Sequence, residues 1–429
     1  MNDTVRAALF EGYSEPIRDV LWGHIYLTPA LSALTEAPPF MRLHRIMQLG
    51  PALHLYPGAT HTRASHSIGV YHLARRLLSQ LLECGADSWL SAEGVRSFLC
   101  AALLHDLGHF PYTHSLKDLP LQAHERLTGK LITSEPVKSL VAGAGADPYL
   151  TAAIVDSSLS RDENGELLFF RRLLSGALDP DKLDYLSRDA RYCGVPYGAQ
   201  DVDFILSRLI PHKDRGIDID SRGITAVESL LFSKYLMYRA VYWHKTVRAA
   251  TAMVKKAVAY ALQSKTIAAE ELYNLDDQGL FALASRQRQV LFGLVQSVRD
   301  GKLFSTAAEV PFNTQAHGVI SDLAKRPFME ESLAAELSTL LGSTLCGDEV
   351  IIDLPEQISF ESGLHVADED ASFSRCSSIF KDELVESLVS SLRIIRVFIH
   401  PKYREQLGCH RKKILHTIEK WLTLEVLSS

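Results

Sequence analysis

The spacing of apolar and polar residues predicts a mainly helical chain over residues 1–300. In segment 66–83, isoleucine and leucine recur mostly at steps of three and four residues, which is the period of an amphipathic helix. Segment 95–107 is apolar almost all round and is followed by a Gly and a Pro, so a buried helix is expected to end there. A longer helix is expected over residues 226–264.

Extended structure is predicted at a few places along the chain. The segment RGIDIDSRGIT at 215–225 alternates apolar and polar residues around Ser-Arg-Gly, which indicates a small hairpin. EVIIDL at 349–354 and RIIRVFIH at 393–400 are typical of strands, and the polar stretch at 368–378 is typical of an exposed loop. We therefore expect a mainly α fold, with a helical core carrying a small hairpin over residues 1–300. A smaller C-terminal α+β region is expected over residues 301–429.

Composition and charge exclude several classes of protein. Hydrophobic residues make up 47% of the chain and charged residues 22%, which is ordinary for a globular protein and excludes wholesale disorder. The net charge is −6 and no long basic block stands out, which argues against a protein built mainly to hold nucleic acid.

The cysteines and the apolar runs indicate the compartment. Six cysteines are scattered without a CxxC pair, so a disulfide framework or a thiolate zinc site is not expected. The most apolar stretch, FLCAALL at 98–104, is far shorter than a membrane span, and the start of the chain does not resemble a signal peptide. We expect a cytoplasmic protein without a membrane partner.

Histidines cluster in one part of the chain, where nine of the 17 fall within residues 44–124. The sharpest signal is HDLGHFPYTH at 105–114, in which an imidazole and a carboxylate follow each other at the end of a nearly uncharged helix. Such a pair suits a borderline divalent ion, and a buried carboxylate is costly unless it is paired or bound to metal. His109 is expected to support this pair, and His61 is expected to be structural.

Further ligands are available on both sides of this motif. His66 stands at the start of the amphipathic helix, and the segment DPDKLDYLSRDA offers Asp179, Asp181, Asp184 and Asp189. On a helix, Asp181 and Asp184 share a face. Spacing does not choose among the four carboxylates, and a solvated acidic helix is the alternative interpretation.

Together these residues resemble the H…HD…D signature of the HD-domain metal-dependent phosphohydrolases. Several motifs also resemble, in order, those of the deoxynucleoside triphosphate triphosphohydrolase branch, which includes bacterial dNTPases and the sterile-alpha-motif-linked HD enzymes of animals. The resemblance runs from about residue 20 to 260, and the segments that carry it are PPFMRLHRIMQLGPALHLYPGATHTRASHSIGV, HDLGHFPYTH, AHE, DPDKLDYLSRD and FSKYLMYRAVYWHK.

The resemblance implies a helical HD-domain core and a role for each matching residue. The implied ligands of a divalent ion (Mn, Mg, Fe, Co, Ni or Zn) are His66, His105, Asp106 and Asp181. The implied catalytic residues are His114, His124 and the adjacent Glu125. Residues that would hold the triphosphate are Arg63, Lys182, Tyr185 and Lys234. Residues that would pack against the deoxyribose are Gln48, Leu49 and Tyr242.

Two positions depart from the animal enzymes. Lys234 stands in place of a phosphate-binding Arg, which keeps the charge but loses bidentate geometry. Lys117 stands in place of an Asp that partners a catalytic His, so the proton-transfer network is expected to differ. For Arg63 the alternative role is to cap the following helix, and the helix around Tyr242 is rich enough in aromatic residues for simple core packing.

The implied activity is metal-dependent hydrolysis of a deoxynucleoside triphosphate to deoxynucleoside and intact triphosphate. One alternative is another HD phosphohydrolase activity, such as a nucleotidase or a phosphodiesterase. The segments DKLDYLSRD and YPGATHTR favour the triphosphohydrolase branch over it. A second alternative is a nucleotide-binding regulator that has lost catalysis, against which the intact ligand and histidine sets argue.

Assembly and regulation are implied by the same resemblance. Relatives in this branch form oligomers, so a homo-oligomer (dimer or tetramer) is expected, and some are activated by nucleotide bound between subunits. Arg45 matches a basic residue of that regulatory site, and Glu36 stands where an Asp reads guanine. A carboxylate can accept two hydrogen bonds from guanine, so a nucleotide activator is chemically possible. The alternative is a surface ion pair between Arg45 and Glu36.

Overall fold

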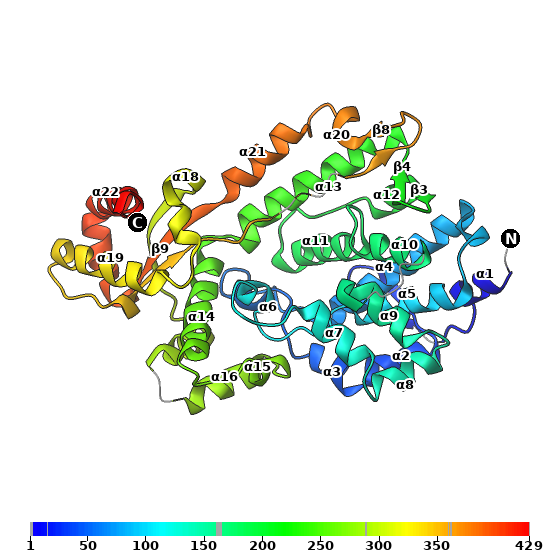
Figure 1. Ribbon diagram of the computed structural model, residues 1–429, viewed down its shortest axis with the longest axis horizontal. Coiled ribbons are helices and arrows are strands. Elements are labelled where there is room, and N and C mark those ends of the chain that lie inside the picture. Colours follow the sequence, from blue (N-terminus) through cyan, green and yellow to red (C-terminus); the bar gives the residue numbers. More distant parts are fainter. Residues whose placement is uncertain are drawn as a thin grey trace.

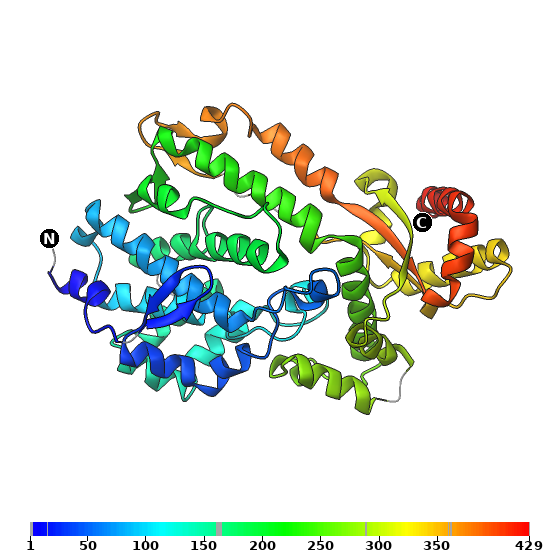
Figure 2. The ribbon, with the colours of Figure 1, turned by 180° about the vertical axis from the view of Figure 1, so that it is seen from behind.

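The computed structural model describes residues 3–14, 16–159, 165–287, 290–358, 360 and 363–428. A larger helical body holds the N-terminal part of the chain, and helix α14 leads from it to a smaller α+β body (Figures 1 and 2). The mainly α class predicted from the sequence is confirmed. Within the part of the chain that the structure describes, no helix combines the length and the apolar character that crossing a membrane requires.

The larger body is built almost entirely of helices. In chain order these are α1 (Asp3–Phe10), α2 (Pro29–Glu36), α3 (Pro38–Leu43), α4 (Arg63–Glu83), α5 (Ala92–Leu104), α6 (Thr113–Leu116), α7 (His124–Ile132), α8 (Val137–Gly143), α9 (Pro148–Val155), α10 (Gly165–Leu174), α11 (Pro180–Cys193), α12 (Val202–Ser207) and α13 (Ile224–Met237). A short hairpin of β1 (Pro16–Asp19) and β2 (Gly23–Tyr26) lies beside them.

Helix α4 packs against both α5 and α11 at the centre of this body. Thr62 caps α4 by accepting a hydrogen bond from the Ser65 amide, and Asp179 caps α11 by accepting one from the Lys182 amide. The apolar segment predicted at 95–107 forms α5, which ends at Leu104, so His105 and Asp106 lie in the turn that follows. Two predicted amphipathic and buried helices are therefore confirmed, with small shifts of their ends.

The predicted hairpin lies earlier in the chain than expected. Strands β3 (Leu209–His212) and β4 (Gly216–Ile219) pair antiparallel, and the turn falls between them rather than at Ser-Arg-Gly. That tripeptide, Ser221–Gly223, forms a single 3-10 turn that leads into α13. The location at 215–225 was wrong because the apolar-polar alternation marks only the second strand.

The helix predicted over 226–264 is interrupted in its middle. Helix α13 ends at Met237, a π-helical turn covers Tyr238–Tyr242, and α14 (Lys245–Gln263) begins after His244, whose ring accepts a hydrogen bond from the Thr246 amide. The Tyr56 hydroxyl donates to the Ala240 carbonyl at 2.8 Å and helps to hold this turn. The side chains of Tyr238 and Tyr242, at the two ends of this turn, pack against the helical core. Turns of π-helix are frequently found at functional sites.

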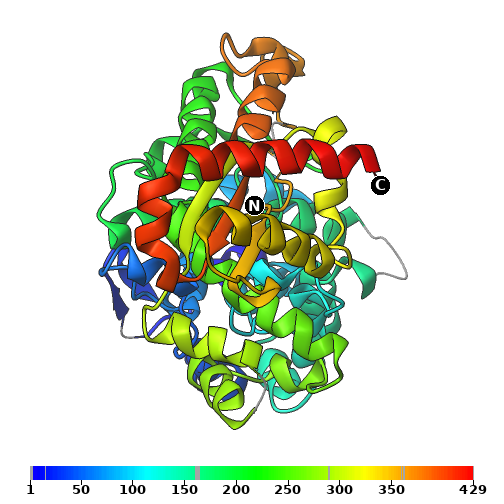
Figure 3. The same cartoon turned by 90° about the vertical axis from the view of Figure 1, so that its left-hand side faces the viewer.

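After α14 come three further helices and the smaller body. The helices are α15 (Glu270–Tyr273), α16 (Asp277–Arg286) and α17 (Gly293–Arg299). The smaller body contains β5 (Ser305–Pro311), α18 (Thr314–His317), α19 (Arg326–Leu341), β6 (Val350–Asp353), β9 (Ile394–Ile399) and α22 (Arg404–Ser428). Both predicted C-terminal strands are confirmed, as β6 and β9. Strand β9 lies in the middle of a three-stranded antiparallel sheet, with β5 on one side and β6 on the other. Figure 3 shows α22 lying across this end of the molecule.

One C-terminal segment returns to the larger body. Strand β7 (His365–Val366) pairs in parallel with β4, and β8 (Ala371–Ser372) pairs with β7. Helices α20 (Phe373–Cys376) and α21 (Asp382–Leu392) follow, and α21 runs beside α13 in both side views (Figures 1 and 2). The prediction of an exposed loop at 368–378 is confirmed only in part. Most of these residues are exposed, but β8 and α20 lie within the segment, and Phe373 is fully buried in the core of the larger body. The regions 1–300 and 301–429 are accordingly interleaved.

Candidate functional site

A cavity of about 320 Å³ opens where α4, α6, α11, the π-helical turn and α14 meet. Most of the site residues predicted from the sequence line it, namely Gln48, Leu49, Arg63, His66, His105, Asp106, His114, His124, Asp181, Tyr185 and Tyr242. Glu125, Lys182 and Lys234 are not among the lining residues. The roles implied for all of these residues stay predictions, but the structure brings the first set into one cavity.

Three of the predicted metal ligands form a compact group. His66, His105 and Asp181 each offer a ligand atom, and these atoms lie within 4.8 Å of one another. The Nδ1 of His105 lies 2.9 Å from the Ala102 carbonyl, which fixes the proton on Nδ1. Its Nε2 is buried and has no hydrogen-bond partner among the described residues. A buried imidazole lone pair beside a carboxylate and a second imidazole is a donor set that fits a divalent cation.

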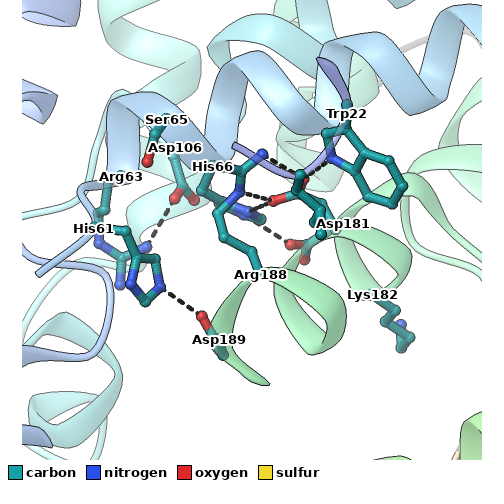
Figure 4. A network of polar contacts seen from close by, with 12 residues as sticks. Trp22, His61, Arg63, Ser65, His66, Asp106, Asp181, Lys182, Arg188 and Asp189 are labelled. Carbon is teal, nitrogen blue, oxygen red and sulfur yellow. Dashed lines mark hydrogen bonds and ion pairs between the residues drawn. The ribbon is translucent and has the colours of Figure 1, made fainter. Parts of the chain in front are cut away.

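His66 is held in place from behind by a buried polar network (Figure 4). Its Nδ1 lies 2.8 Å from Asp184, whose carboxylate also accepts hydrogen bonds from the Trp22 indole at 2.6 Å and from the Arg188 guanidinium at 2.8 and 2.9 Å. Its Nε2 lies 3.0 Å from Asp181. Burial opposes protonation of His66, but the hydrogen bonds to the two carboxylates outweigh this and raise its pKa to about 10. A metal ion would therefore displace a proton from His66 on binding.

A glycine makes this network possible. A Cβ atom at Gly69 of α4 would lie 2.0 Å from the Asp184 carboxylate and 2.4 Å from the Arg188 guanidinium. Only glycine therefore lets α4 approach α11 closely enough for Asp184 to reach His66. Sequence reasoning offered Asp184 as one of four carboxylates but gave no sign that it orients a ligand, because that role depends on helix packing.

Asp106 joins the metal group to a second group of histidines. Its carboxylate lies 3.4 Å from His105 Nε2, 3.0 Å from His109 Nε2 and 2.7 Å from Arg63 Nη1. Asp106, His109 and His124 offer ligand atoms within 4.8 Å of one another, a second group that the sequence did not predict. Burial opposes ionisation of Asp106, but the neighbouring histidines and Arg63 hold its pKa well below the ordinary range.

The two predicted catalytic histidines lie beside this group. The His124 ring is 3.9 Å from the His109 ring and 5.3 Å from the His114 ring, measured between centroids. Burial lowers the pKa of His114 and of His124, and the charge of Arg63 acts in the same direction. Both imidazoles are therefore neutral at pH 7, and burial makes each a weaker base than an exposed histidine. His124 Nδ1 also lies 3.3 Å from Glu125, which faces it from outside the cavity lining.

The predicted phosphate-binding cations are placed unequally. Arg63 reaches the cavity from the first turn of α4. Lys182 instead binds Asp179 at 2.6 Å and the Gly176 carbonyl at 2.9 Å, and Figure 4 shows its side chain pointing away from His66. Lys234 is buried over the Phe360 ring, 5.2 Å from its centroid. Lys117, singled out above as a departure from the animal enzymes, does line the cavity.

The side of the cavity assigned to the sugar contains a hydrogen-bonded chain that the sequence did not predict. The Tyr242 hydroxyl donates to Asp189 at 2.7 Å, and the other oxygen of Asp189 lies 2.7 Å from His61 Nε2. The side-chain oxygen of Gln48 is buried and has no partner among the described residues. Asp189 belongs to the segment of four carboxylates, which was the only signal available, whereas His61 was expected to be structural.

The smaller body completes the cavity. Arg248 of α14 lines it together with Glu356 and Ile358, which follow β6. The Arg248 guanidinium forms two hydrogen bonds with Asp353, at 2.6 and 2.9 Å, and lies 3.4 Å from Glu356. Nothing in the sequence motifs indicated this contribution, because the partners lie about a hundred residues apart and match no local pattern.

The surface ion pair between Arg45 and Glu36, offered as the alternative to a nucleotide site, does not form among the described residues. Arg45 pairs with Asp276 at 2.5 Å, at the start of α16, and more than half of its side chain is exposed. Within the described ranges, Glu36 is exposed and has no ion-pair partner. Because α16 approaches α3 from a distant part of the sequence, local spacing could not predict this pairing.

Comparisons with known proteins agree with the geometry. Residues 63–148 match the family model described as HD domain, and residues 201–421 match the model described as HD associated region. An uncharacterised protein of Methanocaldococcus jannaschii is 33% identical over 267 residues, 62% of this chain and 53% of that protein. Human deoxynucleoside triphosphate triphosphohydrolase SAMHD1 is 29% identical over 274 residues, 56% of this chain and 44% of that protein. This chain thus matches about half the length of these relatives.

A solved structure shows the same fold over most of the chain. A phosphohydrolase from Bacteroides thetaiotaomicron superposes with a TM-score of 0.70 at 24% identity, covering 90% of this chain and 99% of its own. The HD domain model covers the residues that supply His66, His105 and Asp106, and the HD associated region covers the π-helical turn, α14 and the smaller body. The chain therefore belongs to the HD-domain phosphohydrolase superfamily.

Proposed function

We propose that this protein hydrolyses deoxynucleoside triphosphates to deoxynucleoside and triphosphate, with a divalent metal ion. The observation that carries the proposal is the shared cavity, in which the ligand group of His66, His105 and Asp181 lies beside the neutral histidines His114 and His124. Human SAMHD1, whose name states this activity, supports the choice of substrate within the hydrolases of this superfamily.

The metal site is proposed to consist of His66, His105, Asp106 and Asp181. A bound divalent ion would polarise a phosphoryl oxygen and lower the pKa of a water molecule. Asp184 keeps the His66 ring oriented, and the Ala102 carbonyl does the same for His105. Asp106 remains ionised at neutral pH because Arg63 and the histidines around it stabilise its charge.

The remaining groups divide the work on the substrate. Arg63 supplies positive charge where negative charge spreads over the phosphates in the transition state. We assign proton transfer to His114 and His124: one of them would accept a proton from the attacking water and, once protonated, could pass it to the leaving oxygen, which is worth about 10²–10⁴-fold in rate. Tyr242, Gln48 and Leu49 form the wall proposed to pack against the deoxyribose, and Tyr185, which lines the same cavity, is proposed to help hold the triphosphate.

The wall at the sugar predicts discrimination against ribonucleotides. A 2′-hydroxyl would meet crowded side chains, and rejection through one hydroxyl in a tight polar site can exceed a hundredfold. Comparing the hydrolysis of dGTP and GTP therefore tests the assignment of the sugar side. Equal turnover of the two would favour another HD phosphohydrolase activity.

The decisive experiment is a nucleotide panel incubated with Mn²⁺, Mg²⁺ or Co²⁺, with products separated by chromatography. The proposal expects deoxynucleoside and intact triphosphate, whereas release of monophosphate and pyrophosphate or of inorganic phosphate would contradict it. His124→Gln should lower the rate by about 10²–10⁴-fold. Arg222→Gln, which removes an exposed arginine outside the cavity lining, is the comparison and should lower the rate by less than about tenfold.

We also propose a homo-oligomer, either a dimer or a tetramer, with a nucleotide activator bound near Arg45. Arg45 keeps more than half of its side chain exposed despite its pairing with Asp276, so it remains accessible to a ligand. Light scattering combined with hydrolysis of one dNTP in the presence of a second nucleotide tests both parts. A monomer with an unresponsive rate would contradict both, and an oligomer with an unresponsive rate would contradict only the activator.

A further inference from the structure

A second cavity, of about 240 Å³, lies between α14 and the start of α19. Helix α14 lines both cavities. Its residues Val247, Arg248 and Thr251 line the first cavity, and Ala252 and Lys255, on the following turns, line the second. Nothing in the chemistry proposed above uses this second space. Its volume is slightly below the usual range for drug-sized ligands, so it suits a small molecule rather than a whole deoxynucleoside triphosphate.

The charged groups of this cavity are paired unequally. Lys256 is saturated, since its ammonium contacts Glu330 at 2.7 Å and two backbone carbonyls at 2.6 and 2.8 Å. Glu330 accepts from Lys256 and from the Ile352 amide, and Glu331 accepts from the Gly347 amide at 2.7 Å. These carboxylates therefore have their charge or their lone pairs engaged by the protein.

Arg326 and the exposed Asp348, which also lines the cavity, are the exceptions. The Nε of Arg326 donates to the Ile320 carbonyl at 3.0 Å, but within the described residues its two Nη groups have no hydrogen-bond or ion-pair partner. Burial lowers the pKa of Arg326, which shows that the carboxylates nearby do not fully compensate for the loss of water. Lys255 also lines the cavity; its ammonium contacts Asp118 at 2.5 Å, and among the described residues its other two N–H groups have no partner.

Arg326 is also the first residue of α19, a helix of 16 residues with no acidic residue in its first turn. The partial positive charge at the N-terminus of the helix therefore adds to the charge of the guanidinium, since no carboxylate in the first turn neutralises it. An arginine fork and a lysine that face one space at a helix N-terminus are suited to a phosphoryl group. Leu119, Leu323 and Ile351 offer an apolar wall for the body of such a ligand.

An ion pair joins the lining of the second cavity to that of the first. Asp353 lines the second cavity, Arg248 lines the first, and the two side chains form a buried pair of hydrogen bonds at 2.6 and 2.9 Å. A ligand phosphate beside Arg326 would bring negative charge close to Asp353 and would alter how that carboxylate holds Arg248. Coupling between two sites needs such a shared element whose position both can bias.

We propose that the second cavity is an effector site for a small phosphorylated ligand, held by Arg326 and Lys255, that acts on the first cavity through Asp353 and Arg248. The binding half of this proposal is independent of the proposed function, and the coupling half rests on it. The same phosphoryl chemistry is offered by free inorganic phosphate and by a phosphate on an organic body. The two sources are distinguished by titrating inorganic phosphate in one arm and dGMP in the other.

Binding is measured by calorimetry without substrate, on the full chain. Arg326→Gln should weaken binding at this site at least tenfold, and Lys255→Gln should weaken it in the same direction. Arg222→Gln, which removes an exposed arginine paired with Asp220, is the control and should leave binding unchanged. Because phosphate can also enter the first cavity, the same titration on Arg63→Ala should retain the binding that Arg326→Gln loses. Circular dichroism of each variant establishes that it is folded.

The outcomes separate the two halves. Tighter binding of dGMP than of phosphate indicates an organic effector, and equal binding indicates free phosphate; either supports the site. Unchanged affinity in both folded variants, Arg326→Gln and Lys255→Gln, would overturn it. For coupling, the bound probe should change the rate of dGTP hydrolysis at least twofold in the unaltered protein and not in Arg326→Gln. Binding with an unaltered rate would overturn the effector role, whereas absence of any dNTP hydrolysis would contradict the proposed function alone.

Discussion

The two walls of the first cavity hold their charged groups in opposite ways. On the wall of α4, α11 and the turn after α5, which carries His105 and Asp106, the supporting network of Asp184, Trp22 and Arg188 lies behind His66. This arrangement leaves the ligand atoms of His66 and Asp181 directed at the cavity. On the wall of α14, Arg248 lines the cavity but its guanidinium is already bound to Asp353. The first wall is therefore built to bind something, and the second is built to join two parts of the protein. Substitutions should separate these two roles.

The largest effect is expected from removing the ligand pair on the first wall. His105→Ala combined with Asp106→Ala should abolish metal binding and hydrolysis while leaving the helical content largely intact, because the ligand atoms serve the site more than the packing. Metal content measured by mass spectrometry and circular dichroism of the same sample check this. Full metal occupancy in the double variant would show that the ion is held elsewhere.

On the second wall the expected loss is of stability. Arg248→Ala would leave the Asp353 carboxylate buried without its partner, which costs about 3–5 kcal/mol of unfolding free energy. Arg222→Ala, at an exposed ion pair, should change it by less than about 1 kcal/mol. Chemical denaturation gives both values. If Arg248→Ala unfolded like the control, the link between the two bodies would have little energetic weight.

A smaller and more specific effect is expected at Gly69. Gly69→Ala would force a Cβ atom against Asp184 and Arg188, costing about 1–3 kcal/mol and shifting the support of His66. Metal affinity should fall by about 10–100-fold, as for other losses of ligand support. Gly143→Ala is the matched control, since a Cβ there meets nothing within 4 Å. Equal behaviour of the two variants would refute the close approach of α4 to α11.

The smallest effect concerns Asp277, whose carboxylate accepts a hydrogen bond from the Met47 amide beside the cavity. Burial raises the pKa of Asp277 to about 6, above an unfolded value of about 3.9, so the charged form disfavours folding once the pH exceeds both values. The difference of about two pKa units sets an upper limit of about 3 kcal/mol, and the partial exposure of Asp277 reduces the expected gain from Asp277→Asn to about 1 kcal/mol at pH 8. This advantage fades as the pH falls through 6 and is absent below 4. Thermal unfolding at pH 8 and pH 4 measures the difference. A variant that is less stable at pH 8 would reverse the sign.

The first wall could be predicted from sequence far better than the second. His66, His105 and Asp106 stand at helix ends that the apolar pattern marks, and the histidine-aspartate pair is itself local. The choice among four carboxylates on α11 required the resemblance, because all four lie within three turns of one helix and only packing distinguishes them. The role of Asp184 depends on the contact between α4 and α11, which no spacing rule encodes.

The second wall shows why the rest escaped prediction. Arg248 looked like one more polar residue on a long amphipathic helix, and its partners after β6 belong to a region with a different pattern. Lys182 shows the converse problem, since its motif suggested a phosphate ligand whereas its ammonium binds the cap of its own helix. The partner of a long cationic side chain is usually the nearest carboxylate in the folded protein. Sequence spacing alone does not predict which carboxylate that is.

The pairing of Arg248 with Asp353 has a consequence for the order in which the protein is made. The two residues are 105 positions apart, and a ribosome adds roughly 5–20 residues per second, so Arg248 is synthesised about 5–20 s before its partner. During that interval the guanidinium of Arg248, which is buried in the folded protein, lacks the Asp353 carboxylate that balances its charge. The cavity therefore becomes complete only after the chain has grown past Ile358, and the nascent N-terminal part waits for the C-terminal part before it can work.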